Sequence, residues 1–342
     1  MSQKQAQQPR IGLIGCGAIA ESFHLPALGR HSEILSSVTL VDPDLDRAKA
    51  LAGRFGVEST CGDYRELLGA LDGVIVAVPA HLHLPISLEC MRAGVHVLCE
   101  KPLAENPDGV RELVAAAEES GAALLVNQTR RLFPAHQQVK ERIDAGELGP
   151  LRRITYAMGE PFDWPAATGG YFGARGSCKG VLLDLGAHIV DLVCWWLGRE
   201  PELVDYHDDS FGGTEAVAHL DLRAGDCTAS IRLSWLSKLG NTYCVEGEHG
   251  RIEGGAYEWG VMTFTDASGH SRKIRTTATH QTFDDFSARL IDNFLDVLRG
   301  TAAPLVQGHE VLDSIGVIDA CYRSRKRFDM PWHDAWKTAR VG

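Results

Sequence analysis

The chain has no apolar run of membrane-spanning length and no cluster of basic residues. A helix needs about 20 apolar residues to cross a bilayer, and binding to nucleic acid or to an anionic membrane surface needs clustered Lys and Arg. The formal net charge is −11, from 34 Lys and Arg against 45 Asp and Glu. We therefore expect neither nucleic acid nor a membrane as a partner.

None of the nine cysteines forms a Cys-x-x-Cys pair, and several lie in apolar runs. This usage is typical of buried free thiols in a reducing compartment and not of a structural zinc site. Residues 1–10 contain neither a hydrophobic signal core nor a twin arginine. We expect a cytoplasmic protein without a metal site.

At 342 residues, 44% of them apolar, the chain is too long for a single hydrophobic core of ordinary size, so we expect two domains. Short apolar runs alternate with helix-like segments up to about residue 125, which predicts a doubly wound parallel sheet. Strands that alternate apolar and polar residues follow, interrupted by an apolar helix at about 180–197. The predicted class is α/β: a Rossmann domain over 1–129, then an α+β domain for substrate binding and oligomerisation over 130–342, with a large, mostly antiparallel open sheet.

The first strand leads directly into Gly15-x-Gly17-x-x-Ala20. Gly15 allows a tight turn, Gly17 has no Cβ to block a pyrophosphate, and Ala20 lets the next helix pack on the strand. The start of that helix, at Ala18 and Ile19, offers unpaired N–H groups and a positive dipole end. The motif predicts a dinucleotide site.

Asp42 ends the second strand, 25 residues beyond Gly17. An acid at this place hydrogen-bonds the adenine ribose and repels a 2′-phosphate, so we expect NAD, with NADP less favoured. The alternative is that Asp42 only caps the turn Asp42-Pro43-Asp44.

Glu100-Lys101-Pro102 follows a predicted parallel strand at its C-terminal end, where open α/β sheets bind ligands. A lysine there can reach a substrate oxygen beside a nicotinamide ring. Pro102 keeps Lys101 out of helical geometry and is a candidate for a cis bond. The alternative is an exposed lysine before a helix-starting proline.

Asp184 and His188 are four residues apart on the apolar helix, so they share one face, and Asp191 follows three residues later. Polar groups on such a helix must find partners or face a cleft, and histidine suits proton transfer near neutral pH. The alternative is a His–Asp pair that holds the helix in place. A metal site would need a third ligand, which no spacing suggests.

Together these motifs resemble the Gfo/Idh/MocA family of NAD(P)-dependent oxidoreductases over nearly the whole chain. The resemblance rests on the motifs at 15–20, 24–28, 94–103, 146–149 and 182–188. It implies that Lys101, Asp184 and His188 line the substrate site as catalytic residues. A homodimer or homotetramer is also expected, because an open sheet with one apolar face must be covered.

The predicted cofactor contacts are Gly15, Gly17, Ala18, Ile19, Asp42, Pro79, His83, Glu100 and Lys101. The predicted substrate contacts are Lys101, Arg130, Tyr156, Lys179, Asp184 and His188, and aromatic residues in the second domain suit stacking on a sugar face. Two departures from the family leave the substrate and one contact open. Cys178-Lys179-Gly180 replaces a segment that is often glycine-rich, and Ala80 replaces an Asn common in relatives.

We expect a dehydrogenase or reductase that acts on a secondary alcohol of a sugar, cyclitol or sugar derivative by hydride transfer to nicotinamide C4. His188 takes the hydroxyl proton, Lys101 stabilises the alkoxide, and Asp184 orients His188 or binds a neighbouring hydroxyl. Whether Lys101 or His188 is the base stays open. The alternatives are a non-catalytic NAD(P)-binding regulator, and an enzyme whose tightly bound NAD serves transient oxidation for epimerisation or bond cleavage.

Overall fold

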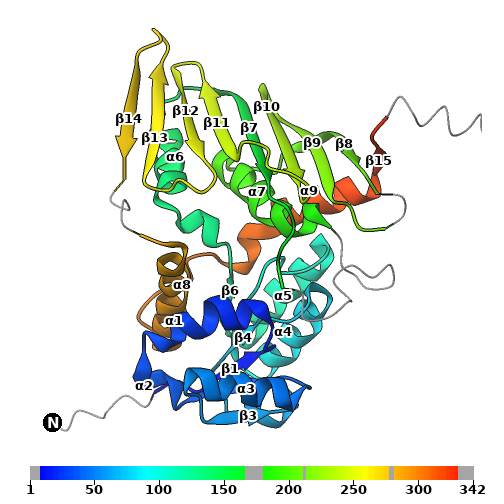
Figure 1. Ribbon diagram of the computed structural model, residues 1–342, viewed down its shortest axis with the longest axis vertical. Helices are drawn as coiled ribbons and strands as arrows, with labels where there is room; N and C mark the ends of the chain where they lie inside the picture. The colour runs from blue at the N-terminus through cyan, green and yellow to red at the C-terminus, as the bar shows by residue number, and fades with distance from the viewer. Residues whose placement is uncertain (1–7, 166–179, 211–212, 277–280, 330–342) are drawn as a thin grey trace, which may run out of the picture.

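The computed structural model describes residues 8–165, 180–210, 213–276 and 281–329. The predicted substrate contact Lys179 and the neighbouring Cys178 lie outside these ranges. Two sheets are stacked end to end along the long axis of the molecule, one parallel and one mostly antiparallel (Figure 1). The predicted mixed α/β architecture is confirmed.

The first sheet has six parallel strands in the order β3-β2-β1-β4-β5-β6. Since β1 lies between β2 and β4, the strand order reverses there, and ligands of such sheets bind at the strands' carboxyl ends beside this point. The strands are β1 (Ile11–Ile14), β2 (Val38–Val41), β3 (Ser59–Cys61), β4 (Gly73–Val76), β5 (His96–Cys99) and β6 (Leu124–Val126). The helices are η1 (Ala20–His24), α1 (Leu25–Gly29), α2 (Ser32–Leu35), α3 (Leu45–Phe55), α4 (His83–Arg92) and α5 (Pro107–Ser120).

The second sheet has nine strands in the order β14-β13-β12-β11-β7-β10-β9-β8-β15, with two parallel pairs, β7–β10 and β8–β15. Its strands are β7 (Leu151–Gly159), β8 (Glu202–Asp208), β9 (Val217–Ala224), β10 (Cys227–Ser234), β11 (Thr242–Gly247), β12 (Gly250–Gly255), β13 (Val261–Asp266), β14 (Ser271–Arg275) and β15 (Lys326–Arg327). Its helices are α6 (Pro134–Asp144), α7 (Val181–Leu197) and α9 (Leu312–Arg323). Within the described ranges, no helix has the length and apolar character needed to span a membrane.

The apolar face of the second sheet is covered within the same chain. Leu220 and Leu222 of β9 are buried in one core with α7 and α9, whereas His219 and Asp221 point to the opposite face. Figure 1 shows α6, α7 and α9 on one side of the sheet. We expected a second subunit to cover an apolar face of this sheet. That reasoning is wrong, because helices of the same chain cover the apolar face and the face left open is polar. The oligomer itself stays a prediction.

Helix α8 (Phe283–Leu298) packs on the first sheet although it follows β14 of the second sheet in sequence. Its Phe294 and Leu295 share a core with Ile11 of β1, and α8 lies beside α1 (Figure 1). A Cβ added to Gly73 of β4 would lie 2.7 Å from Leu298 Cδ2 and 2.8 Å from the Phe294 ring. The segment predicted as a separate domain, 130–342, therefore also supplies a layer of the first domain.

A buried ion pair joins the two halves of the chain. Arg131, in the 3₁₀ turn η4 (Thr129–Leu132) after β6, donates two hydrogen bonds of 2.7 Å to the Asp191 carboxylate on α7. Its Nη1 also lies 3.1 Å from Oε1 of Glu310, in η6 (Gly308–Val311). Asp191 is 1% exposed and its charge is satisfied there, so its role is structural.

We predict that Arg131→Leu lowers the free energy of unfolding by about 3–5 kcal/mol, because it leaves the Asp191 carboxylate buried and unpaired. The matched control is Arg299→Leu, which removes an exposed pair with Asp296 and should cost about 1 kcal/mol or less. Urea unfolding followed by circular dichroism measures both. Equal losses in the two variants would contradict the prediction.

Candidate active site

The glycine-rich turn after β1 fits the pyrophosphate of a dinucleotide. Gly15 has φ +97°, and a Cβ added there would lie 2.5 Å from the Ala77 carbonyl oxygen. A Cβ added to Gly17 meets nothing within 4 Å, so the space beside it is open. The helix that begins at Ala18 and continues through Ile19 presents first-turn N–H groups without intrahelical acceptors. This turn can therefore hold the diphosphate.

Asp42 both caps its own turn and holds the glycine-rich turn. Its Oδ1 accepts the Asp44 N–H at 2.9 Å, and its Oδ2 accepts the Cys16 N–H at 2.9 Å. Arg47, in the first turn of α3, brings a guanidinium nitrogen 3.5 Å from Oδ2. Sequence reasoning missed this positive charge, which lines a hollow of about 380 Å³ together with Gly17.

His83 is a structural link between two strand ends. Its Nδ1 lies 2.7 Å from the Pro102 carbonyl oxygen and its Nε2 lies 2.8 Å from that of Val78. The residue is 1% exposed and burial lowers the pKa of His83, so the neutral ring donates its one N–H to one of these two carbonyl groups. A cofactor contact through His83 stays a prediction. Pro79 remains exposed at the carboxyl end of β4, and the peptide between Lys101 and Pro102 is cis.

Glu100 is also held by protein groups. Its Oε1 accepts a hydrogen bond of 2.6 Å from Asn127 Nδ2 and lies 2.8 Å from His24 Nε2. Burial alone would raise the pKa of Glu100, but the bond with His24 and the other nearby donors hold it below its ordinary value. The carboxylate thus fixes the end of β5 beside Lys101, and a direct cofactor contact by Glu100 stays a prediction.

Lys101 reaches across to the helix α7. Its Nζ lies 2.6 Å from Oδ1 of Asp184 and donates to the Asp184 carbonyl oxygen at 3.1 Å. Trp235 Nε1 donates to the other carboxylate oxygen at 3.3 Å. The alternative of a solvent-exposed lysine is therefore wrong, since the Lys101 side chain is 15% exposed. Asp184 is the partner of Lys101 rather than of His188.

His188 is oriented by Gln128, a residue that sequence reasoning missed. Gln128 Nε2 donates to the Ala187 carbonyl oxygen at 3.1 Å, so its Oε1, 3.1 Å from His188 Nδ1, is the acceptor of that contact. The hydrogen-bond network therefore assigns the proton to Nδ1 and leaves on Nε2 a lone pair that no described residue occupies. Gln128 follows β6 at the ligand-binding edge of the first sheet, which is the signal that could have identified it.

The imidazole of His188 is neutral in this environment. Burial lowers the pKa of His188 well below its ordinary value, and the positive charges of Lys101 and Arg130 lower it further. A neutral ring with a free Nε2 can accept a proton from a hydroxyl group, and the neighbouring ammonium can bond the same oxygen. The arrangement is suited to alcohol and carbonyl chemistry.

Arg130 and Tyr156 differ in how they could meet a substrate. The Arg130 guanidinium donates to the Ala256 carbonyl oxygen at 3.2 Å and lies 5.3 Å from the centre of the Tyr257 ring. The Tyr156 ring is 1% exposed and packs against the Tyr243 ring in the core. Stacking of Tyr156 on a sugar face is therefore excluded, and only its hydroxyl lies near Arg130.

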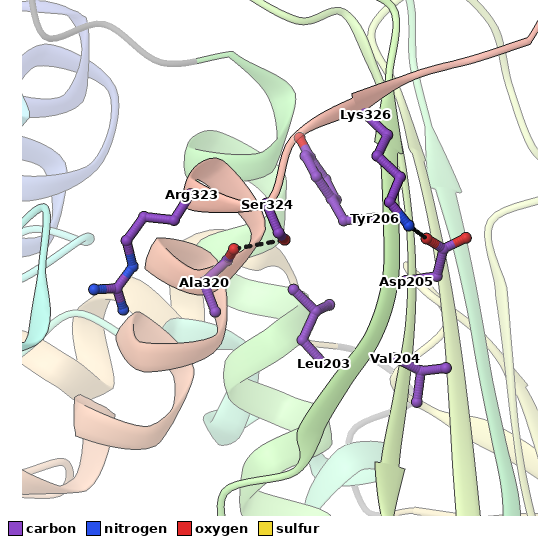
Figure 2. A pocket seen from close by; sticks show the side chains of 8 residues that line it. All are labelled: Leu203, Val204, Asp205, Tyr206, Ala320, Arg323, Ser324 and Lys326. Carbon is purple, nitrogen blue, oxygen red and sulfur yellow. Dashed lines mark hydrogen bonds and ion pairs between the residues drawn. The ribbon is translucent and has the colours of Figure 1, made fainter.

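A separate hollow of about 350 Å³ lies between β8 and α9 (Figure 2). Its charged and hydroxyl groups already have partners: Lys326 pairs with Asp205 at 2.7 Å, Arg323 with Asp319, and Ser324 with the Ala320 carbonyl. It therefore lacks free groups for catalysis. In the part of the chain that the structure describes, no group of three His, Cys, Asp or Glu residues could hold a metal ion.

Residues 9–128 match the "Oxidoreductase family, NAD-binding Rossmann fold" of the GFO_IDH_MocA proteins, and residues 136–253 match the "GFO/IDH/MocA C-terminal domain". The chain belongs to the Gfo/Idh/MocA family. The family assignment confirms the resemblance, the oxidoreductase class and the nicotinamide dinucleotide as cofactor.

The similarity to known proteins extends over most of the chain. A dTDP-3,4-didehydro-2,6-dideoxy-alpha-D-glucose 3-reductase of Actinomadura kijaniata is 30% identical over 309 residues, 87% of this chain and 88% of that protein. Inositol 2-dehydrogenase of Rhizobium meliloti (strain 1021) is 24% identical over 325 residues, 92% and 96% of the two chains. A crystal structure of a 3-ketoreductase from Actinomadura kijaniata with NADP and TDP-benzene has a TM-score of 0.80 at 26% identity, covering 95% of this chain and 100% of that one.

We predict that the pH profile of kcat/KM has no break near pH 6.5, the ordinary pKa of histidine, because the pKa of His188 is lowered. A lowered pKa keeps His188 in its proton-accepting form as the pH falls, so the activity that depends on this ring persists from about pH 8 to about pH 6. The measurement is the pH profile of the wild type and of His188→Asn. A break near 6.5 that only the wild type shows would contradict the prediction.

Proposed function

We propose that the chain is a dehydrogenase or reductase that acts on a secondary alcohol of a sugar, cyclitol or sugar derivative and prefers NAD to NADP. The observation that carries the proposal is the position of the Lys101 ammonium and the His188 imidazole around one place beyond β5. The relatives named as a glucose-derivative 3-reductase and an inositol 2-dehydrogenase support this substrate class.

The mechanism assigns a separate task to each side chain. A bound nicotinamide supplies the acceptor or donor of hydride at the substrate carbon. In oxidation, His188 Nε2 accepts the hydroxyl proton, while the Lys101 ammonium bonds the same oxygen and stabilises its developing negative charge, worth about 3 kcal/mol. In reduction the same steps run in reverse: His188 returns the proton to the substrate oxygen, and the Lys101 ammonium bonds that oxygen and stabilises its negative charge. Asp184 holds the ammonium in place.

We predict that Lys101→Ala and His188→Ala each slow the single-turnover rate of substrate oxidation by about 10²–10⁴-fold and leave the Kd for NADH nearly unchanged. The reason is that both side chains act on the substrate oxygen, and the cofactor contact predicted for Lys101 is one of nine. Lys273→Ala, on the exposed strand β14, is the control and should behave like the wild type. Near-normal rates in either active-site variant would refute its assigned role.

We predict that Asp42→Asn lowers the ratio of the Kd for NADPH to the Kd for NADH by about tenfold. The substitution removes the negative charge that repels a 2′-phosphate, and the positive charge of Arg47 remains beside the site. Asparagine keeps one carbonyl acceptor for the turn. Asp44→Asn, which also loses a carboxylate paired with Arg47 but at an exposed site, is the matched control. Fluorescence titration measures the Kd values, and an unchanged ratio would show that Asp42 is only a turn residue.

The test of the function as a whole is a screen for NAD reduction against free sugars, inositols, aminocyclitols and nucleotide sugars. Formation of one NADH for each substrate oxidised is the expected result. Binding of dinucleotide without turnover of any substrate would favour the regulator, and product formation without released NADH would favour epimerisation or bond cleavage.

We also propose a homodimer or homotetramer formed through the outer face of the nine-stranded sheet. On that face Asp221 of β9 pairs with Arg232 of β10, and both side chains are only partly exposed, which suits a polar interface. Sedimentation analysis that finds a monomer would overturn this proposal.

A cytoplasmic location is supported by the cysteines of the described ranges, which are free thiols.

A further inference from the structure

Arg130 carries a buried positive charge that has no carboxylate partner among the described residues. The residue is 6% exposed, and its hydrogen bond is to a neutral group, the Ala256 carbonyl oxygen, at 3.2 Å. Its neighbour Arg131 is equally buried but is bonded to two carboxylates, Asp191 and Glu310. Buried arginines are almost always paired with an acid. The exception at Arg130 indicates that a ligand provides the missing charge.

The guanidinium of Arg130 lies beside the groups proposed to act on the substrate. Arg130 follows two residues after Gln128, which holds the His188 ring at 3.1 Å, and its charge acts on that ring. On the other side it lies 5.3 Å from the ring centre of Tyr257, which is 42% exposed. The charge is therefore placed between the active site and the surface.

A second unsatisfied donor lies next to this charge. The Tyr156 hydroxyl is buried beside Arg130, which can only donate a hydrogen bond to its oxygen, and within the described ranges no acceptor takes the hydroxyl proton. Burial raises the pKa of Tyr156 to about 12, so the hydroxyl keeps its proton at neutral pH and can donate it to an anion. The two groups together present donors that have no anionic acceptor among the described residues.

We propose that Arg130 and Tyr156 bind a carboxylate of the substrate, which makes the substrate a sugar acid or a cyclitol acid. The inference rests on the proposed function and narrows its substrate class. Arg130 has five N–H donors, and the bond to Ala256 leaves enough of them for the two parallel bonds that a planar carboxylate accepts.

The charge balance of the site favours one negative charge on the ligand. Asp184 neutralises Lys101 at 2.6 Å, and His188 is neutral, so Arg130 contributes the net charge. A single guanidinium with a neutral hydroxyl matches a carboxylate better than a phosphate dianion. A carboxylate fixed at Arg130 would also hold the rest of the substrate in one orientation toward Lys101 and His188.

The experiment compares matched substrates that differ in one group: D-glucuronate with D-glucose, D-galacturonate with D-galactose, and D-glucose 6-phosphate for the phosphate. We expect the wild type to have a kcat/KM about 10- to 100-fold higher for the acid of each pair, and we expect the ratio of kcat/KM for acid and neutral sugar to fall to about one in Arg130→Gln. Arg272→Gln is the matched control, because Arg272 also lies over an aromatic ring, that of Phe264, but on an exposed strand. Arg130→Lys keeps the charge without the planar guanidinium and should show an intermediate preference for the acids over the neutral sugars. This variant replaces Arg130→Gln in the test if Arg130→Gln does not fold.

Calorimetry separates failure of this inference from failure of the proposed function. The same sugars are titrated into the wild-type and variant enzymes saturated with NADH, so that no turnover is needed. Tighter binding of the acids that disappears in Arg130→Gln supports the carboxylate site even if none of the sugars is oxidised. Equal binding of acids and neutral sugars by the wild type, equal losses for both in the variant, or a preference for the 6-phosphate over the uronate would overturn the inference.

Discussion

The ion pair between Lys101 and Asp184 is the contact on which the proposed active site depends. Lys101 stands at the end of a strand of the first sheet, and Asp184 stands on the helix that covers the second sheet. Their 2.6 Å contact brings a cation to the same helix face that carries His188. Without this contact, the two groups proposed to act on one oxygen would belong to separate layers of the molecule.

Helix α7 makes further contacts of this kind with the first half of the chain along its length. Its polar residues Asp184, His188 and Asp191 follow one another at intervals of four and three residues, so they form one stripe on an apolar helix. Each meets a partner from the first half of the chain: Lys101, Gln128 and Arg131, respectively. The stripe therefore fixes α7 against the nucleotide-binding half of the molecule, with His188 between the two ion pairs.

Sequence periodicity and motifs predicted the parallel sheet, the mostly antiparallel sheet, the apolar helix α7, the glycine-rich turn and the meeting of Lys101 with the face of α7. They failed where the signal is weak or long-range. The strands β3, β12 and β14 contain polar residues or glycine and no apolar run, so their sequences do not mark them. The positions of α8, His83 and Gln128 depend on contacts between distant residues, and no local pattern records such a contact.

The return of α8 to the first sheet has a consequence for biosynthesis. Residues up to β6 emerge from the ribosome long before Phe283–Leu298, and domains generally fold in the order of their synthesis. Until this helix arrives, the apolar surface around Gly73 and Ile11 has no cover. The nascent N-terminal sheet is therefore an incomplete folding unit until Phe283–Leu298 has been synthesised.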